Sequence, residues 1–465
     1  MAMQMGQEII VDFDVPARMR DGTILRANIY RPAGEGAWPV LLTRLPYGKD
    51  LPLGGSILDP AQAARRGYVV IVQDTRGRFT SAGDWTPFVN EGRDGVDTVE
   101  WAAQLPYSNG NVGMYGISYF GFTQWATAIY HPAALKAMLP VQTWNDPLNG
   151  VIYRGGALEL GSSGGWNTLM GLDVLIRRHR GNPQELGRAI YLLAKEIDAL
   201  GKLGYWSLPL KEFGPLQRQD IAPTFFRTFE SPMDREHEMV EPMTIVGKHE
   251  EVTVPTFNVG GWYDIFLQDT ISNFTTMREH GATPEARQSK LLIGPWSHGG
   301  FTNPVGELNF GFGASAAFID LSMDIMSLQL RWFDHWLKGV DTGILKEAPI
   351  KLFVMGANVW RDEQEWPLAR AVNTRYYLHS NGHANTLHGD GYLMTYAPAS
   401  DEPTNDRYDY DPNNPVITKG GALLMTPEYP SGPRDQRETE SRQDVLVYSS
   451  GELKEDLEVT GPIHV

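Results

Sequence analysis

The chain has 465 residues, a formal net charge of −16 and no cysteine. Its length predicts two or three domains, and its acidic excess argues against nucleic acid or an anionic membrane as a partner. Without cysteine it cannot form disulfides, thiolate nucleophiles, Cys-ligated zinc sites or iron–sulfur clusters.

The first 145 residues alternate between strand and helix patterns. Residues 23–32 alternate apolar and polar side chains before a proline, which is typical of an antiparallel strand. Apolar, β-branched runs then predict two buried strands over 38–48 and 67–77. The other expected elements are helices within 59–67, 91–105 and 120–132 and strands within 110–116 and 134–142. This order predicts a largely parallel sheet covered by helices.

Residues 146–240 interrupt the alternation. Gly-rich and charged stretches at 156–167 and 175–200 carry helical periodicity and few strand signals. A mostly helical insertion is therefore expected here.

The sheet pattern resumes with buried-type strands in 252–264 and 289–300. The amphipathic segment 318–339 then predicts a long helix that ends at Gly339.

The last part of the chain, residues 349–465, has a different texture. Short strand-like runs are separated by Pro, Gly, Asn and Asp, at 350–355, 374–379, 444–450 and 457–465. This pattern predicts an all-β domain of sandwich or jelly-roll type.

Two serines are candidates for a nucleophile. Ser163 lies in Gly-Ser-Ser-Gly-Gly, which has Gly-x-Ser-x-Gly spacing, but no parallel strand precedes it, so we interpret it as part of a flexible loop. Ser118 lacks that spacing because Phe120 stands where the second glycine belongs. It does follow a predicted strand and precede a predicted helix, as a nucleophile elbow requires. The motif alone is equally consistent with a tight turn that needs a small residue.

A serine nucleophile also needs a base and a carboxylate that orients the base. Asp264 and His298 each follow a predicted buried strand, and the chain order Ser, Asp, His is that of α/β-hydrolases. Asp264 has a nearby rival in Asp269, and both Asp264 and His298 are open to a reading as turn or loop residues. Three candidates at three strand ends favour a catalytic triad.

The sequence contains no nucleotide or metal motif. It has no P-loop, no Gly-x-Gly-x-x-Gly between a strand and a helix, and no His-Glu-x-x-His. We therefore expect no cofactor and no metal.

Several segments resemble one family of enzymes. The motifs are LPYGKD, QDTRGRF, GISYFGFTQW, GWYD, GPWSHG and KLFVMGANVWRDEQEWPL. They resemble the bacterial cocaine esterase and X-prolyl dipeptidyl aminopeptidase family (CocE/NonD, S15-like) of α/β-hydrolases, with the greatest likeness to the cocaine esterase branch. The family's elbow reads Gly-x-Ser-Tyr-x-Gly, which accounts for Phe120.

The resemblance implies three domains and an activity. The expected domains are an α/β-hydrolase domain over 1–145 and 241–348, a helical cap over 146–240, and a C-terminal jelly roll over 349–465. The implied activity is serine hydrolysis of carboxylic esters through an acyl-enzyme.

The resemblance also implies the catalytic roles. Ser118 would be the nucleophile, His298 the general base and acid, and Asp264 the orienting carboxylate. The hydroxyl of Tyr47 and the backbone N–H of Tyr119 would form the oxyanion hole. For Tyr47, packing of the ring with an exposed hydroxyl is the alternative.

Four aromatic residues are expected to bind substrate. The resemblance places Phe266 in the acyl pocket, and Trp144 and Trp166 lie near the cap, although tryptophans usually pack in cores. Phe120 stands where α-amino acid ester hydrolases typically have glutamate, which favours an apolar ester.

The alternative activity is that of an X-prolyl dipeptidyl aminopeptidase or an α-amino acid ester hydrolase or acylase with the same triad. It stays open because Asp146 or Glu159 in the cap could bind a substrate ammonium.

Localisation and partners complete the expectations. No secretion signal or membrane-spanning apolar run is visible, so a cytoplasmic protein with a small-molecule ester substrate is expected. By the resemblance, the jelly roll would continue past residue 465 and leave unpaired strand edges here. We therefore expect a truncated or cleaved chain, or a homodimer or partner chain that completes the β domain.

Overall fold

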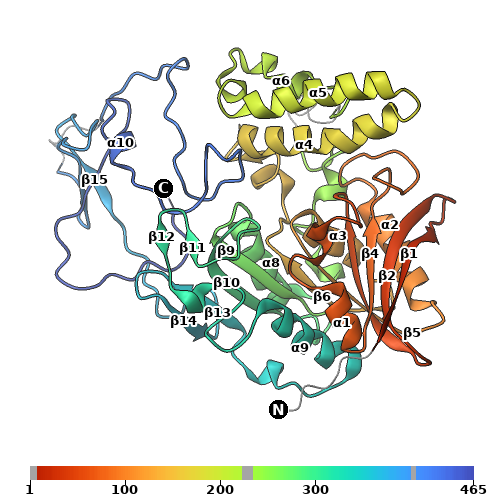
Figure 1. Ribbon diagram of the computed structural model, residues 1–465. Coiled ribbons are helices and arrows are strands. Elements are labelled where there is room, and N and C mark those ends of the chain that lie inside the picture. Colours follow the sequence, from red (N-terminus) through yellow and green to blue (C-terminus); the bar gives the residue numbers. More distant parts are fainter. Residues whose placement is uncertain (1–7, 223–233, 400–404, 465) are drawn as a thin grey trace.

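A ten-stranded sheet forms the centre of the protein. The structure is a computed structural model, and it describes residues 8–222, 234–399 and 405–464. Across the sheet (Figure 1) the strands are β1 (Ile9–Arg18), β2 (Ile24–Pro32), β4 (Val69–Asp74), β3 (Trp38–Leu45), β5 (Ser108–Ile117), β6 (Leu135–Val141), β9 (Phe257–Tyr263), β10 (Lys290–Ser297), β13 (Ile350–Val354) and β14 (Val359–Glu363).

The strand directions confirm the predicted α/β fold. The strands from β4 to β13 run parallel, while β1, β2 and β14 pair antiparallel at the two edges. The parallel strands therefore direct their carboxyl ends to one edge of the sheet, where α/β proteins place their sites.

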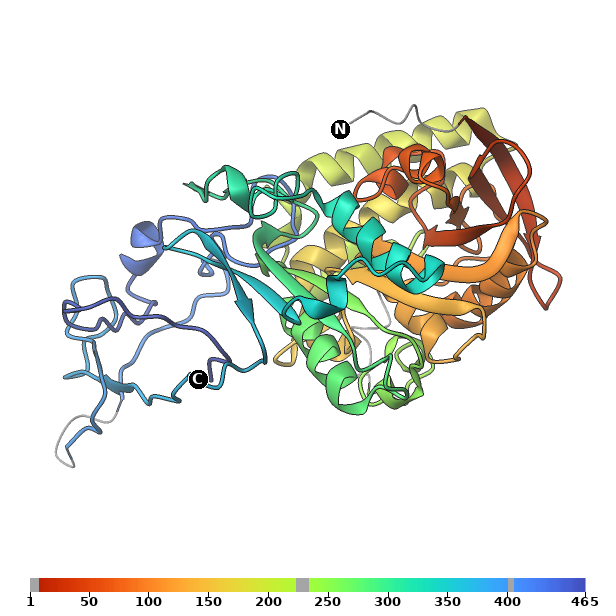
Figure 2. The same cartoon turned by 90° about the horizontal axis from the view of Figure 1, so that it is seen from below.

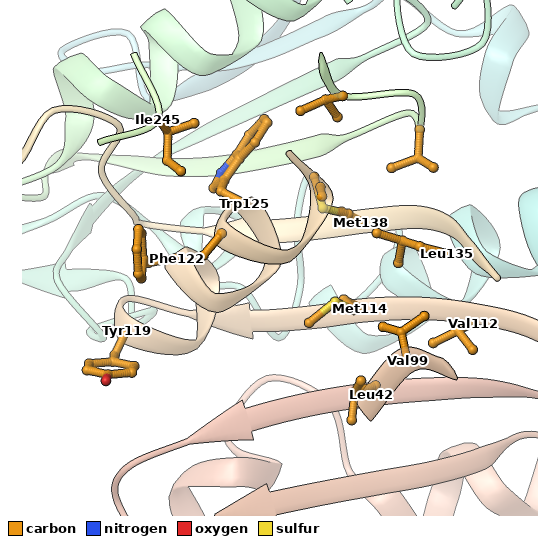
Figure 3. Packing of buried hydrophobic residues seen from close by; sticks show 14 of the residues in the cluster. Leu42, Val99, Val112, Met114, Tyr119, Phe122, Trp125, Leu135, Met138 and Ile245 are labelled. Carbon is orange, nitrogen blue, oxygen red and sulfur yellow. The ribbon is translucent and has the colours of Figure 1, made fainter. Parts of the chain in front are cut away.

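Helices cover both faces of the sheet. Apolar side chains pack α2 (Glu91–Ala103), α3 (Tyr119–Ala128) and α8 (Leu267–His280) on one face and α1 (Pro60–Arg65) and α9 (Ile325–Lys338) on the other. Figure 3 shows the first face, where Trp125 of α3 lies near Met138 of β6, and Phe122 and Met114 belong to the same cluster. Helix α9 ends as predicted, because Gly339 adopts a left-handed φ of 68°.

The chain between β6 and β9 contains the predicted helices. They are α4 (Leu160–Arg178), α5 (Pro183–Leu200) and α6 (Gly214–Gln217), preceded by a small hairpin of β7 (Tyr153–Arg154) and β8 (Ala157–Leu158). They lie above the sheet in Figure 1, and we call residues 142–256 the cap segment.

The flexible-loop interpretation of Ser163 is wrong. Ser163 lies in the first turn of α4, and its Oγ donates a hydrogen bond to the carbonyl of Val151 at 2.8 Å. A Cβ on Gly164 would lie 2.7 Å from the ring of Phe213. The glycine there reflects close packing of the cap, not a mobile loop.

The region after β10 holds fewer regular elements than predicted. Strands β13 and β14 extend the central sheet, although they lie beyond the predicted domain division at residue 348. Besides α9 and two short 3₁₀ helices (Phe312–Ala314 and Ile344–Lys346), the other described elements are the pair β11 (Pro304–Val305) and β12 (Leu308–Asn309), the pair β15 (Tyr377–His379) and β16 (Tyr392–Met394), and α10 (Arg437–Glu440). Figure 2 shows the described residues after β14 to one side of the main body.

Two strand predictions in this region are wrong. Within 444–450 only Ser449 pairs, through a single bridge to Tyr392, and the described residues of 457–465 form no strand. Leu457, Val459 and Ile463 are more than half exposed. An alternating pattern makes a strand only when a neighbouring strand can pair with it.

In the three ranges that the structure describes, no helix is long and apolar enough to cross a membrane.

Candidate active site

Ser118 occupies a sharp turn between β5 and α3. Its backbone has φ 58° and ψ −121°, a strained conformation for a residue other than glycine. Close packing requires the flanking glycines, since a Cβ on Gly116 would lie 2.3 Å from the Phe120 ring and one on Gly121 2.8 Å from Thr143. This is the strand–turn–helix geometry of a nucleophile elbow.

The three predicted triad residues lie within hydrogen-bond distance of one another. Ser118 Oγ is 2.9 Å from His298 Nε2, and His298 Nδ1 is 2.6 Å from Asp264 Oδ1. Asp264 follows β9 and His298 follows β10, so neighbouring parallel strands bring them together. Asp264 is 1% exposed, so water does not compete with His298 for its carboxylate.

Asp269, the rival of Asp264, has a different place. Its Oδ2 accepts hydrogen bonds from the backbone N–H groups of Asn145 (3.0 Å) and Asp146 (3.3 Å) at the start of the cap segment. Burial raises the pKa of Asp269 to about 7. Asp269 therefore binds the backbone of the cap segment, whereas Asp264 binds His298.

Gln142 positions the loop that carries His298, and the sequence analysis missed it. Gln142 Nε2 donates to the Ser297 carbonyl (2.9 Å), and its Oε1 accepts from Gly299 N–H (2.7 Å). One amide thus brackets the histidine on both sides. The available signal was a polar residue at the carboxyl end of a predicted strand.

Tyr47 follows β3, and its hydroxyl lies in the site. That oxygen accepts a hydrogen bond from Trp166 Nε1 at 3.0 Å. Burial raises the pKa of Tyr47 to about 12, while the hydrogen bond from Trp166 and the nearby Arg78 and Ser118 act to lower it. The phenol is neutral near pH 7 and keeps a proton to donate.

Tyr119 directly follows Ser118, and its hydroxyl forms two hydrogen bonds in the interior. The hydroxyl donates to Glu91 Oε1 (2.8 Å) and accepts from Phe88 N–H (3.0 Å). Glu91 in turn pairs with buried Arg44 at 3.1 Å. The backbone N–H of Tyr119 belongs to the first turn of α3, where the helix itself supplies no acceptor.

A cavity opens beside the triad, and we call it the catalytic pocket. Its walls include Ser118 and three predicted aromatics, Trp144, Trp166 and Phe266. The ring of Phe266 lies 5.4 Å from that of His298, centroid to centroid. Among the described residues, no acidic or basic side chain lines this pocket.

The prediction that Phe120 binds substrate is not supported by its position. It is 1% exposed, does not line the catalytic pocket, and packs in the core on the α9 face of the sheet. The physical reason is helical rotation, since successive residues of α3 point about 100° apart.

The sequence analysis also missed wall residues that come from distant segments. Met239 and Met243 line the pocket from the end of the cap segment, and Leu424 lines it from the C-terminal region. A second cavity adjoins the first and shares Ser162, Ile265 and Leu424 with it. Apolar residues in irregular segments carry no local signal for such a role.

The two cap carboxylates considered for ammonium binding lie outside the pocket walls. Asp146 pairs with Arg235, and Glu159 pairs with Arg154 and lines the second cavity. Within the described part of the chain, no cluster of three or more His, Asp or Glu side chains is arranged to hold a metal ion.

The elbow, the triad geometry and the parallel sheet define an α/β-hydrolase. Residues 21–300 match the X-Pro dipeptidyl-peptidase (S15) family, and residues 342–465 match the C-terminal non-catalytic domain of X-Pro dipeptidyl-peptidases. The chain belongs to this family, as its motifs predict, and it is a hydrolase.

Relatives and solved structures agree with this assignment. The chain is 33% identical to cocaine esterase of Rhodococcus sp. (strain MB1 Bresler), over 97% of this chain and 76% of the relative. An aminopeptidase from the marine sediment archaeon Thaumarchaeota archaeon has the same fold, with a TM-score of 0.68, 21% identity, and coverage of 97% of this chain and 73% of that one. A CocE/NonD family hydrolase from Staphylococcus aureus aligns with a TM-score of 0.59 and 22% identity, over 84% of this chain and 61% of that one.

Proposed function

We propose that this protein is a serine esterase that cleaves small carboxylic esters with an apolar acyl group. The observation that carries the proposal is the hydrogen-bonded chain from Ser118 through His298 to buried Asp264. The relationship to a cocaine esterase at 33% identity adds support for an ester substrate.

The proposed reaction has two halves. Ser118 Oγ attacks the ester carbonyl while His298 Nε2 takes the serine proton, and Asp264 stabilises the resulting imidazolium. The imidazolium then gives its proton to the departing alcohol, which leaves an acyl group on Ser118. In the second half His298 takes a proton from water as the water oxygen attacks the acyl carbonyl, and the imidazolium then returns that proton to Ser118 Oγ as the acid leaves.

The tetrahedral intermediate needs hydrogen-bond donors for its oxyanion. We assign this role to the Tyr47 hydroxyl and the Tyr119 N–H. The support is that Tyr119 directly follows Ser118 and that Tyr47, Ser118 and Tyr119 line the same pocket. The high pKa of Tyr47 keeps its proton in place at neutral pH. Preorganised donors of this kind contribute about 10²- to 10³-fold to kcat.

Aminopeptidase activity is the second candidate, because the family is named for it. Recognition of a substrate ammonium requires a nearby carboxylate, since a buried charge must be paired. The described walls of the catalytic pocket hold none, and Asp146 and Glu159 pair with arginines. An uncharged ester is therefore the better fit.

Covalent labelling tests the nucleophile. A fluorophosphonate probe should attach to Ser118 alone, as identified by peptide mapping, and Ser118→Ala should not be labelled. Label on Ser163 or on another serine would contradict the proposal.

Parallel assays test the substrate class. We expect turnover of p-nitrophenyl esters of apolar acids and at most trace turnover of X-Pro p-nitroanilides. A preference for the anilide, abolished when its amino terminus is acetylated, would instead support the aminopeptidase.

A further inference from the structure

Arg78 is a buried cation that the catalytic assignment leaves without a role. It lies in the loop after β4, and its side chain is only 2% exposed. A buried guanidinium requires a partner and several acceptors because desolvation of a charge costs free energy. Its contacts therefore indicate what it does.

The guanidinium joins three segments of the chain. Its Nε donates to the carbonyl of Pro46 at 2.9 Å, and its Nη1 donates to the carbonyl of Met170 in α4 at 3.2 Å. Asp173, one turn further along α4, places Oδ2 3.6 Å from Nε. The Pro46 carbonyl belongs to the peptide bond that leads into Tyr47.

A second set of contacts reaches the Tyr47 hydroxyl. The Arg78 guanidinium lies 4.2 Å from the centroid of the Trp85 ring. The ring centroids of Trp85 and Trp166 are 5.8 Å apart. Trp166 Nε1 then donates to the Tyr47 hydroxyl. The backbone and the hydroxyl of Tyr47 are thus both connected to Arg78.

We propose that Arg78 is a positioning residue that fixes Tyr47 in the oxyanion hole and makes this placement depend on the docking of cap helix α4. This inference rests on the proposed function of Tyr47. A planar fork with several donors suits the role, because it bonds two carbonyls in fixed directions while a lysine ammonium cannot. Its positive charge also lies near the phenol that would meet the oxyanion.

Arg177 provides a matched control. It also joins α4 to the loop after β4, with Nη1 donating to the carbonyls of Phe79 (2.8 Å) and Ser81 (2.9 Å). None of its hydrogen bonds given by the structure reaches Pro46 or Tyr47. If an Arg78 variant lost activity only because the cap was less firmly attached, an Arg177 variant should therefore lose as much.

The test is a double-mutant cycle on esterase activity, with Arg78→Lys, Tyr47→Phe and the combined variant. We expect Arg78→Lys to lower kcat about 10-fold with little change in KM, since it displaces one oxyanion donor. In the Tyr47→Phe background the same change should have no further effect, because the donor is already absent. Arg177→Lys should leave kcat within about twofold, even if its Tm falls.

Several outcomes would overturn the inference. One is an unchanged kcat in Arg78→Lys. Another is a fall in kcat from Arg78→Lys that is as large in the Tyr47→Phe background as in the wild type. The third is a fall in kcat as large in Arg177→Lys as in Arg78→Lys. If Arg78→Lys does not fold, Asp173→Asn takes its place, with a smaller fall in kcat expected that is again absent in Tyr47→Phe.

The single variant Tyr47→Phe separates this inference from the proposed function. Its kcat should fall about 10²- to 10³-fold. A wild-type kcat would remove the oxyanion role of Tyr47 itself, whereas the proposed triad is tested independently by labelling of Ser118.

Discussion

The groups placed to react and the walls around them come from two different parts of the molecule. Ser118, Asp264 and His298 follow β5, β9 and β10, and the hydrogen-bonded sheet fixes the ends of these strands. Much of the pocket wall belongs to the cap segment and to Leu424 of the C-terminal region, where regular structure is sparser. We infer that the sheet positions the reacting groups, whereas the cap segment and the C-terminal region shape the space available to a substrate.

Ser118, at the end of a sheet strand, and Ser163, in the cap segment, should show the largest difference between the two regions. Ser118→Ala should lower kcat by about 10⁶-fold, because it removes the nucleophile itself. Ser163→Ala, in the cap wall of the same pocket, should cost at most about 10-fold, since it loses only a packing contact and a hydrogen bond to Val151. Steady-state kinetics on one ester measures both, and comparable losses would show that the division between sheet and cap is wrong.

A second comparison separates core from pocket. Phe120→Ala should lower the free energy of unfolding by about 3–5 kcal/mol, because it leaves a hole in the core. Its KM for esters should change little. Phe266→Ala, in the pocket wall, should mainly raise KM for apolar esters. Denaturant unfolding and steady-state kinetics on both variants measure these effects. A large rise in KM for Phe120→Ala, with little loss of stability, would contradict the prediction.

The stability of the protein should depend on pH through Asp269, whose carboxylate accepts hydrogen bonds from the start of the cap segment. Its pKa of about 7 exceeds the unfolded value of about 3.9. The native state therefore holds a proton that the unfolded state has released, and stability should fall as pH rises from about 4 to about 7. The loss attributable to this group is at most about 4 kcal/mol.

Asp269→Asn tests this pH dependence. The amide cannot ionise, so the variant should lose less stability than the wild type between about pH 4.5 and pH 7.5. Denaturant unfolding at the two pH values gives the difference. Parallel curves for variant and wild type would exclude Asp269 as the source.

The smallest effect is expected at the wall that the two cavities share. Leu424→Ala should join the catalytic pocket more openly to the second cavity, and so improve kcat/KM for long esters relative to short ones by about 10-fold, the worth of one or two buried methylene groups. Ester series that lengthen either the acyl or the alcohol part would show which part occupies the added space. An unchanged length preference would indicate that the wall does not limit the substrate.

The sequence was informative where local pattern and topology agree. Buried strands, the helix that ends at Gly339 and the positions of Ser118, Asp264 and His298 were all predictable, because each combines a periodic pattern with a strand end. The family motifs added Tyr47, which no periodicity marks.

The failures have a common physical origin. Ser163 was misread because glycines that permit close packing against Phe213 resemble those of a loop. Residues 444–450 were misread because pairing, not alternation, makes a strand. Gln142, Arg78 and Leu424 escaped notice because their roles depend on contacts between distant segments, as in the separation of 155 residues between Gln142 and Ser297.

The bracket that Gln142 forms around His298 has a consequence for the catalytic cycle. Both ends of its amide are engaged, to the carbonyl before the histidine and to the N–H after it. The backbone on both sides of His298 is therefore held in place, and Asp264 holds its Nδ1 at 2.6 Å. In the proposed mechanism the same Nε2 faces first the serine and then the incoming water, so we expect turnover to need no movement of this loop between the two halves of the reaction.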